Sequence, residues 1–192
     1  MKSVKRMVVD IETLGVNSRS PVLSIWAVIL AKDLSIEDRV RDIIEWRIDA
    51  SLYDYFNGSF VVDFSTIKWW VDQKLTAKKT AFTGSESPGI VCQELADIYR
   101  EAECGEIWAN HPQFDVVILE NLFKQYDVKV PWNYYDVFDT ATIKLFLSQL
   151  KRDEFKNDLV AHVASDDAIY EARCLQWLLP KLKVEVNNDI LY

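Results

Sequence analysis

Val8-Val9-Asp10-Ile11-Glu12-Thr13 is an apolar run that ends in two carboxylates two residues apart. If this run is a β-strand, Asp10 and Glu12 project from the same face, because side chains alternate along a strand. Two carboxylates directed at one place repel each other and stay ionised together only beside a cation. The pair therefore predicts a site for a hard divalent metal such as Mg²⁺ or Mn²⁺. The alternative is a strand end that carries two solvated acids.

Three apolar segments near the start of the sequence predict neighbouring strands: residues 4–11, 22–30 and 44–48. The second segment is almost entirely apolar, which is typical of a strand covered on both faces. The third alternates apolar and charged residues, as a half-exposed strand does. Because the three lie close together in the sequence, we expect an antiparallel meander.

From Ser51 onward, helical patterns alternate with shorter apolar runs. The predicted helices are one over 67–71 capped by the segment 63–66, one containing the apolar stripe Ile90, Val91, Leu95 and Ile98, one beginning at 110–112, one over 139–150 and one over about 165–182. Strands are expected at 107–109 and 134–138, and 151–158 is a polar stretch. This order predicts a single α/β domain over residues 1–192 with a mixed five-stranded sheet.

The composition indicates a folded protein that does not bind nucleic acid through a broad basic surface. Of its 192 residues, 49% are hydrophobic and 12% aromatic, and the formal net charge is −8. Broad electrostatic binding of phosphates requires basic residues, so this class of nucleic-acid-binding protein is disfavoured. An enzyme that binds its own metal cations remains compatible with the charge.

The three cysteines, Cys92, Cys104 and Cys174, form neither a C-x-x-C pair nor an even-numbered disulfide framework. We expect them to be reduced in a cytoplasmic protein. The apolar run near the N-terminus is too short for a signal peptide, and no run approaches the ~20 apolar residues of a membrane-spanning helix. We therefore expect no membrane partner.

Two further acidic motifs occur where helices are predicted to begin. Asp115 lies in the first turn of the helix after Asn110-His111-Pro112, and Asp167 lies in the first turn of the last helix. His162 precedes that last helix, for which Ser165 is the expected cap. Helix N-termini favour negative charge, so both acids are placed where an ionised carboxylate is stabilised.

Together these motifs resemble those of the DnaQ-like, or DEDDh, 3′–5′ exonucleases. The resemblance rests on Asp10-x-Glu12-Thr13, Asn110-x-x-x-Phe114-Asp115 and His162-x-x-x-x-Asp167, in this order. The small single-domain, DexA-like branch is the most similar, through the segments 20–25, 66–70 and 162–172. One departure is the stretch Val137-Phe138-Asp139-Thr140, where that branch often has an arginine before the threonine.

The resemblance implies an RNase H-like fold and a two-metal mechanism. Four carboxylates would hold two Mg²⁺ or Mn²⁺ ions, and His162 would be the general base. The implied metal ligands are Asp10, Glu12, Asp115 and Asp167, and the implied substrate-binding residues are Ile11, Thr13 and Phe114. The implied partner is a nucleic acid with a free 3′ end, and the branch allows a homodimer.

Several residues have a second interpretation. Asp166 competes with Asp167 as the ligand, although the spacing from His162 favours Asp167. His111 is interpreted as a residue of the turn before a helix rather than a second base. Either Trp69 or Trp70 could stack on a base, but packing is the preferred interpretation, and the pairs Lys78-Lys79 and Lys151-Arg152 are interpreted as solvated surface.

The function predicted from sequence is hydrolysis from the 3′ end to nucleoside 5′-monophosphates, with single-stranded DNA preferred over RNA. A 3′–5′ exoribonuclease of the same fold is the alternative. A non-catalytic binding module is disfavoured because all five catalytic positions are filled. An RNase H-like endonuclease is disfavoured by the arrangement of His162 and Asp167.

Overall fold

A mixed five-stranded sheet forms the centre of the protein. The computed structural model describes residues 4–36, 43–156, 159 and 164–181. The strands are β1 (Lys5–Thr13), β2 (Val22–Leu30), β3 (Ile43–Arg47), β4 (Cys104–Ala109) and β5 (Val137–Asp139), in the spatial order β3-β2-β1-β4-β5. β1 pairs antiparallel with β2, and β2 with β3, whereas β4 is parallel to β1 and to β5. The predicted fold class, with three antiparallel strands followed by alternating helices and strands, is confirmed.

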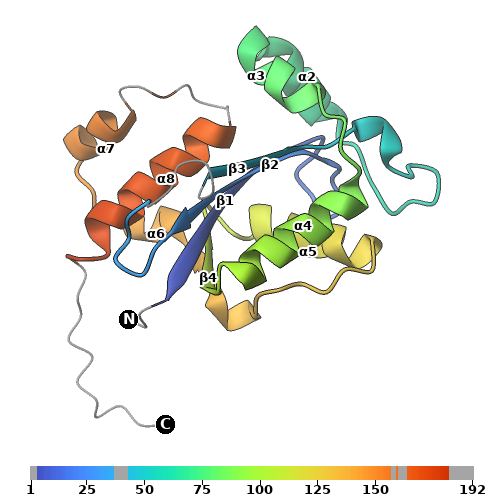
Figure 1. Ribbon diagram of the computed structural model, residues 1–192. Helices are drawn as coiled ribbons and strands as arrows, with labels where there is room; N and C mark the ends of the chain where they lie inside the picture. Colours follow the sequence, from blue (N-terminus) through green and yellow to red (C-terminus); the bar gives the residue numbers. More distant parts are fainter. Residues whose placement is uncertain (1–3, 37–42, 157–158, 160–163, 182–192) are drawn as a thin grey trace.

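The helices are short and cover both faces of the sheet (Figure 1). They are α2 (Phe64–Asp72), α3 (Leu75–Phe82), α4 (Pro88–Glu101), α5 (Asp115–Gln125), α6 (Thr140–Lys144), α7 (Gln149–Lys156) and α8 (Ala164–Leu178). Two 3₁₀ turns, η1 (Ala50–Leu52) and η2 (Tyr134–Asp136), lie in the connections.

The two faces of β1 belong to different hydrophobic cores. Met7, Val9 and Ile11 pack with residues of α4 and α5 on one face, whereas Val8 packs with residues of α8 on the other. Side-chain alternation therefore directs Asp10 and Glu12 towards the α8 side of the sheet. Ala168, Ala172 and Leu175 of α8, with Leu179 directly after it, cover this face.

Several expected element boundaries differ from those of the structure. The helix expected from Asn110 begins only at Asp115, because a turn with a positive φ at His111 comes first. The helix expected over 139–150 ends at Lys144, and a second helix, Gln149–Lys156, occupies most of the expected polar stretch 151–158. Residues 134–136 form a 3₁₀ turn rather than strand, and the last helix ends at Leu178. The sequence also gave no indication of α3, which has only two buried side chains, Ala77 and Ala81.

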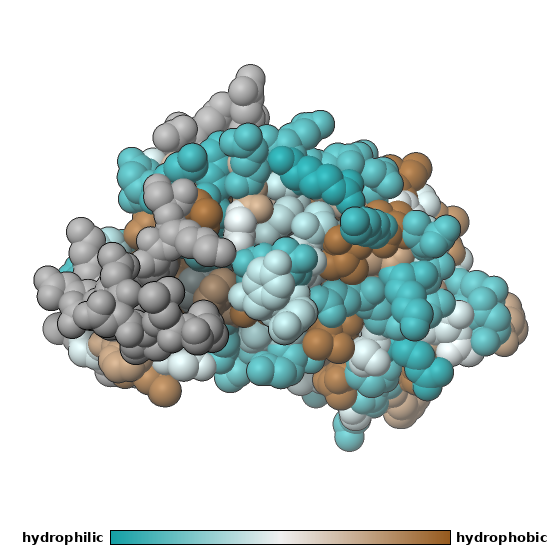
Figure 2. Space-filling view, turned by 90° about the horizontal axis from the view of Figure 1, so that it is seen from below, coloured by the Kyte–Doolittle hydropathy of each residue, from teal (hydrophilic) through white to brown (hydrophobic). Residues whose placement is uncertain are grey.

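The surface mixes polar and apolar residues. On the face shown in Figure 2, hydrophobic residues form several separate patches between hydrophilic ones. None of the helices in the described part of the chain has the length and hydrophobicity needed to cross a bilayer.

Candidate active site

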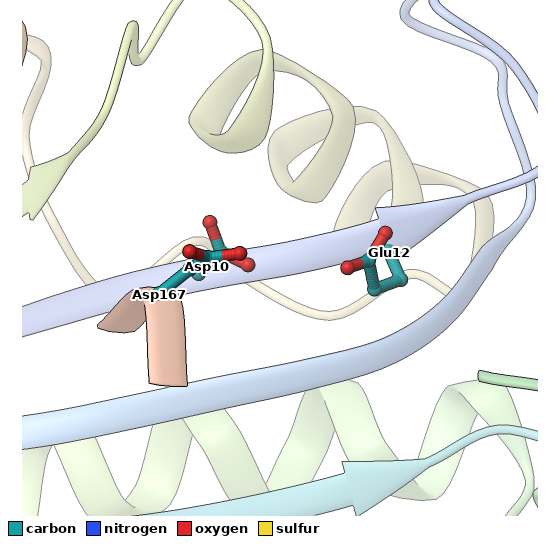
Figure 3. A group of neighbouring side chains, drawn as sticks. All are labelled: Asp10, Glu12 and Asp167. Atoms are coloured by element: carbon teal, nitrogen blue, oxygen red, sulfur yellow. The ribbon is translucent and has the colours of Figure 1, made fainter. Parts of the chain in front are cut away.

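Three carboxylates from two elements meet beside the sheet. Oxygen atoms of Asp10, Glu12 and Asp167 all lie within 4.8 Å of one another. Figure 3 shows the Asp167 side chain reaching from α8 to Asp10, with Glu12 further along β1. Asp10 and Glu12 share a strand face, as the alternation predicted, and Asp167 lies in the first turn of its helix. Asp166 is not part of this group, and it accepts a hydrogen bond from the Ser165 hydroxyl at 3.3 Å.

Asp115 lies next to this group and is fixed to the central strand. The pairing between β1 and β4 ends at Val8 and Trp108, so the β1 backbone beyond it lacks a partner strand on that edge. The Ile11 backbone N–H instead donates to Asp115 Oδ1 at 3.3 Å. Asp115 is buried, and it comes from the helix on the opposite face of the sheet from α8. The end of β4 therefore creates the opening through which this fourth carboxylate reaches the site.

The carboxylates disfavour one another's ionised forms. Burial, followed by repulsion from Asp115, Glu12 and Asp167, holds the pKa of Asp10 well above its usual range. Burial raises the pKa of Glu12 to about 8, with a further contribution from Asp167 and Asp115. Burial also raises the pKa of Asp115 to about 7, although the hydrogen bond from Ile11 opposes the increase. Without a cation, the negative charge of these carboxylates is therefore not fully balanced.

The donor set fits divalent metal ions. Asp10, Glu12 and Asp167 offer carboxylate oxygens at mutual distances short enough to share an ion, and Asp115 adds a fourth carboxylate beside them. Oxygen-only ligands suit hard cations, and a cation would relieve the repulsion that raises these pKa values. A divalent metal site is the chemical interpretation of this geometry.

A cavity of about 490 Å³ adjoins the carboxylates. Glu12 belongs both to the cavity wall and to the carboxylate group. The residues that line the cavity are Ile11, Glu12, Thr13, Gly15, Val16, Ser65, Thr66, Trp69 and Phe114. All three residues predicted to bind substrate therefore line the cavity. α2 adds Trp69, for which packing was the preferred interpretation, and Ser65 and Thr66, which had no expected role.

The two neighbouring tryptophans have different roles. Trp70 is buried, and its Nε1 donates to the Thr13 carbonyl oxygen at 2.9 Å, which fixes α2 to the end of β1. Trp69 is 39% exposed and lines the cavity, as Phe114 does. The expectation that at most one of them faces a substrate agrees with this arrangement.

Of the two histidines, His111 alone falls within the described residues. His162, the predicted base, lies outside the described residues. His111 is exposed, and its backbone N–H donates to Asp139 Oδ1 at 3.0 Å while its carbonyl oxygen accepts from Phe114. His111 therefore belongs to the turn before α5, as expected.

A largely buried ion pair, which no sequence pattern predicted, lies beside the carboxylates. Lys144 Nζ lies 2.6 Å from Glu171 Oε1, and it also donates to Asn110 Oδ1 at 2.8 Å. Glu171 could have been found from its position four residues after Asp167, which places both on one helix face. Lys144 carries no comparable signal, because its partners are 27 and 34 residues away.

The chain is similar in sequence to a known protein family. A family model described as "3′-5′ exoribonuclease Rv2179c-like domain" matches residues 5–179. No curated protein matches the chain in sequence.

Solved structures of exonuclease I share the fold. A zinc-bound complex of Escherichia coli exonuclease I with single-stranded DNA matches with a TM-score of 0.67 and 10% identity, over 94% of this chain and 41% of that one. The E. coli enzyme in complex with a dT13 oligonucleotide matches with a TM-score of 0.64 and 12% identity, over 93% of this chain and 42% of that one. A product-bound exonuclease I matches with a TM-score of 0.62 and 10% identity, over 94% of this chain and 45% of that one. This chain therefore spans less than half the length of these exonuclease I chains.

Proposed function

This chain belongs to the Rv2179c-like 3′–5′ exoribonuclease domain family, and we propose that it removes nucleotides singly from the 3′ end of single-stranded RNA. The observation that carries this proposal is the position of Glu12, which lines the 490 Å³ cavity and also belongs to the carboxylate group. A terminal nucleotide in the cavity would therefore place its phosphodiester beside the carboxylates.

The carboxylates would bind two divalent cations, Mg²⁺ or Mn²⁺. Asp10, Glu12 and Asp167 form the core of this site, and Asp115 completes it from α5. When bound, such ions lower the pKa of a water molecule and offset the charge that develops on the phosphoryl oxygens. The role of the protein is to hold four carboxylates in place against their mutual repulsion.

The reaction is hydrolysis of the last phosphodiester bond. A water oxygen attacks the phosphorus atom and the bond from phosphorus to the 3′ oxygen breaks, which gives a nucleoside 5′-monophosphate and a shortened strand. We assign the acceptance of the water proton to His162, because a near-neutral pKa suits this step. Ile11, Thr13 and Phe114 would hold the terminal nucleotide, and the exposed Trp69 would contact its base.

Single-stranded DNA is the second candidate substrate. It is the substrate preferred in the sequence analysis, and E. coli exonuclease I of the same fold binds DNA oligonucleotides. That preference stays a prediction. RNA comes first here because the matching family is described as exoribonuclease.

Matched RNA and DNA oligonucleotides, labelled at either end, would test this proposal. We expect Mg²⁺ or Mn²⁺ to support release of labelled mononucleotide at once from the 3′-labelled RNA, and only at the end of digestion from the 5′-labelled strand. The Asp167→Asn variant is the control for contaminating nucleases. Faster digestion of DNA would transfer the proposal to the second candidate, and internal cleavage would contradict both.

A further inference from the structure

Lys144, the last residue of α6, joins two segments that carry proposed metal ligands. Its ammonium group contacts Glu171 Oε1 at 2.6 Å and Asn110 Oδ1 at 2.8 Å. The Lys144 side chain is 12% exposed and that of Glu171 only 5%. Because neither charge is well hydrated, each depends on the other.

Both partners of Lys144 lie close in sequence to a carboxylate of the site. Glu171 is one helical turn beyond Asp167 on α8, so the two project from the same side of that helix. Asn110 directly follows β4 and precedes Asp115 by five residues. Asp115 is in turn bonded to the Ile11 N–H on β1. Hydrogen bonds therefore link α8, α6, the segment between β4 and α5, and the central strand.

Glu171 is also a fifth acid beside the site. It contributes to the repulsion that raises the pKa values of Asp10 and Asp115. Its Oε2 is buried, and within the described part of the chain it has no hydrogen-bond partner. A fifth carboxylate would worsen the repulsion among the ligands, and the ammonium group of Lys144 offsets it.

We propose that Lys144, with Glu171 and Asn110, forms a clamp that holds the segments bearing Asp167 and Asp115 in position before metal ions bind. Lys144 is thus a positioning residue that acts through the carboxylates. This inference rests on the proposed metal-dependent function and adds to it the means by which the site is preformed.

Metal affinity without nucleic acid tests the clamp directly. Calorimetric titration of the whole chain with Mn²⁺ would compare the wild type with Lys144→Met. Loss of a group bonded directly to a metal ligand typically costs ~10–100-fold in metal affinity. Lys144 acts one step further out, through Glu171 and Asn110, so we expect a weakening near the lower end of this range. Asn110→Ala removes only one hydrogen bond of the clamp, so we expect a smaller loss in a variant that leaves the ion pair intact.

A double variant separates positioning from stability. Lys144→Met alone leaves the Glu171 charge buried without its partner and should lower the melting temperature. Lys144→Met combined with Glu171→Met removes both charges, so we expect the melting temperature to recover while Mn²⁺ affinity stays low. Recovery of Mn²⁺ affinity in the double variant would show that Lys144 only neutralises the charge of Glu171. That result would overturn the proposed clamp.

A matched lysine provides the control. The Lys156 ammonium lies 4.7 Å from the centre of the Tyr170 ring, and the Lys144 ammonium lies 5.3 Å from it. Lys156→Met should leave Mn²⁺ affinity unchanged.

In RNA digestion, saturating Mn²⁺ should restore most of the activity of Lys144→Met. An unchanged Mn²⁺ affinity in both Lys144→Met and Asn110→Ala would overturn the clamp. A wild-type protein that binds Mn²⁺ but leaves RNA intact would overturn the proposed function alone.

Discussion

The charged side chains at the two ends of β1 have opposite electrostatic surroundings. Near its start, Arg6 and Glu106 are 3% and 6% exposed and form an ion pair at 2.8 Å, and Trp108 Nε1 donates to the same carboxylate at 2.9 Å. Near its end, Asp10 and Glu12 face a third acid, Asp167. The first charge is compensated within the protein, whereas the second group requires an external cation. One strand therefore carries a structural ion pair and the proposed metal site within a few residues of each other.

The comparison teaches that burial alone does not identify a functional group. Glu106 and Asp115 are both almost fully buried, but their neighbours differ. Glu106 has a guanidinium partner, whereas Asp115 lies among acids and its pKa is raised by burial to about 7. Uncompensated acids that converge are the feature that indicates the site.

The largest effect should come from removing an acid at the uncompensated end. We expect Asp167→Asn to abolish 3′–5′ nuclease activity while the metal-free protein stays folded, because the change removes a ligand and one source of repulsion. Nucleotide release from labelled RNA and circular dichroism would measure the two quantities. Full activity of this variant with Mg²⁺ would show that Asp167 is not a ligand.

The proposed base should have the next largest effect. We expect His162→Ala to lower the rate ~10²–10⁴-fold and to flatten its rise between acidic and neutral pH, since a general base contributes in this range. Single-turnover rates measured across this pH range would test it. A pH–rate profile with the wild-type shape would remove His162 from the role.

The compensated end should respond in stability rather than in chemistry. Arg6→Met leaves the Glu106 carboxylate buried without its partner, which typically costs ~3–5 kcal/mol. Urea unfolding would measure the loss, and the rate per folded molecule should stay close to that of the wild type. The double variant with Glu106→Gln should recover part of the stability, and a selective loss of activity in Arg6→Met would break the distinction between the two ends.

The pH dependence of stability should distinguish the two ends most finely. In the metal-free protein, Glu12 has a pKa of about 8 against a usual 4.5, so it binds more protons folded than unfolded between these values. The unfolding free energy should therefore fall as pH rises through this range. Thermal melts from pH 5 to 8 should show the decline, Glu12→Gln should reduce it, and Mn²⁺ should raise the melting temperature more at pH 8 than at pH 5. A metal-free protein that becomes more stable towards pH 8 would contradict the site's electrostatics.

The elements that the sequence predicted well are those with one dominant local signal. β2 has the predicted bounds Val22–Leu30 because an unbroken apolar run has one stable place, the centre of a sheet. A capped helix forms where one was expected: the Asp63 side chain accepts from the Ser65 N–H, although α2 begins at Phe64, inside the segment expected to precede it. By contrast, α3 and α7 lie at the surface with weak or polar patterns, and the turn at His111 depends on contacts with Asp139. The cytoplasmic location, the single domain and the homodimer stay predictions.

The sequence by itself determined the acids of the site and the strand on which two of them lie, because alternation and helix starts are local properties of the chain. Only the tertiary structure decided that Asp115 bonds to the β1 backbone, that Trp69 lines the cavity while Trp70 supports it, and that Lys144 connects Glu171 with Asn110. Each of these contacts joins residues 27 to 104 positions apart. Such pairings depend on where β4 ends and how α8 packs on the sheet, which no local pattern of residues encodes.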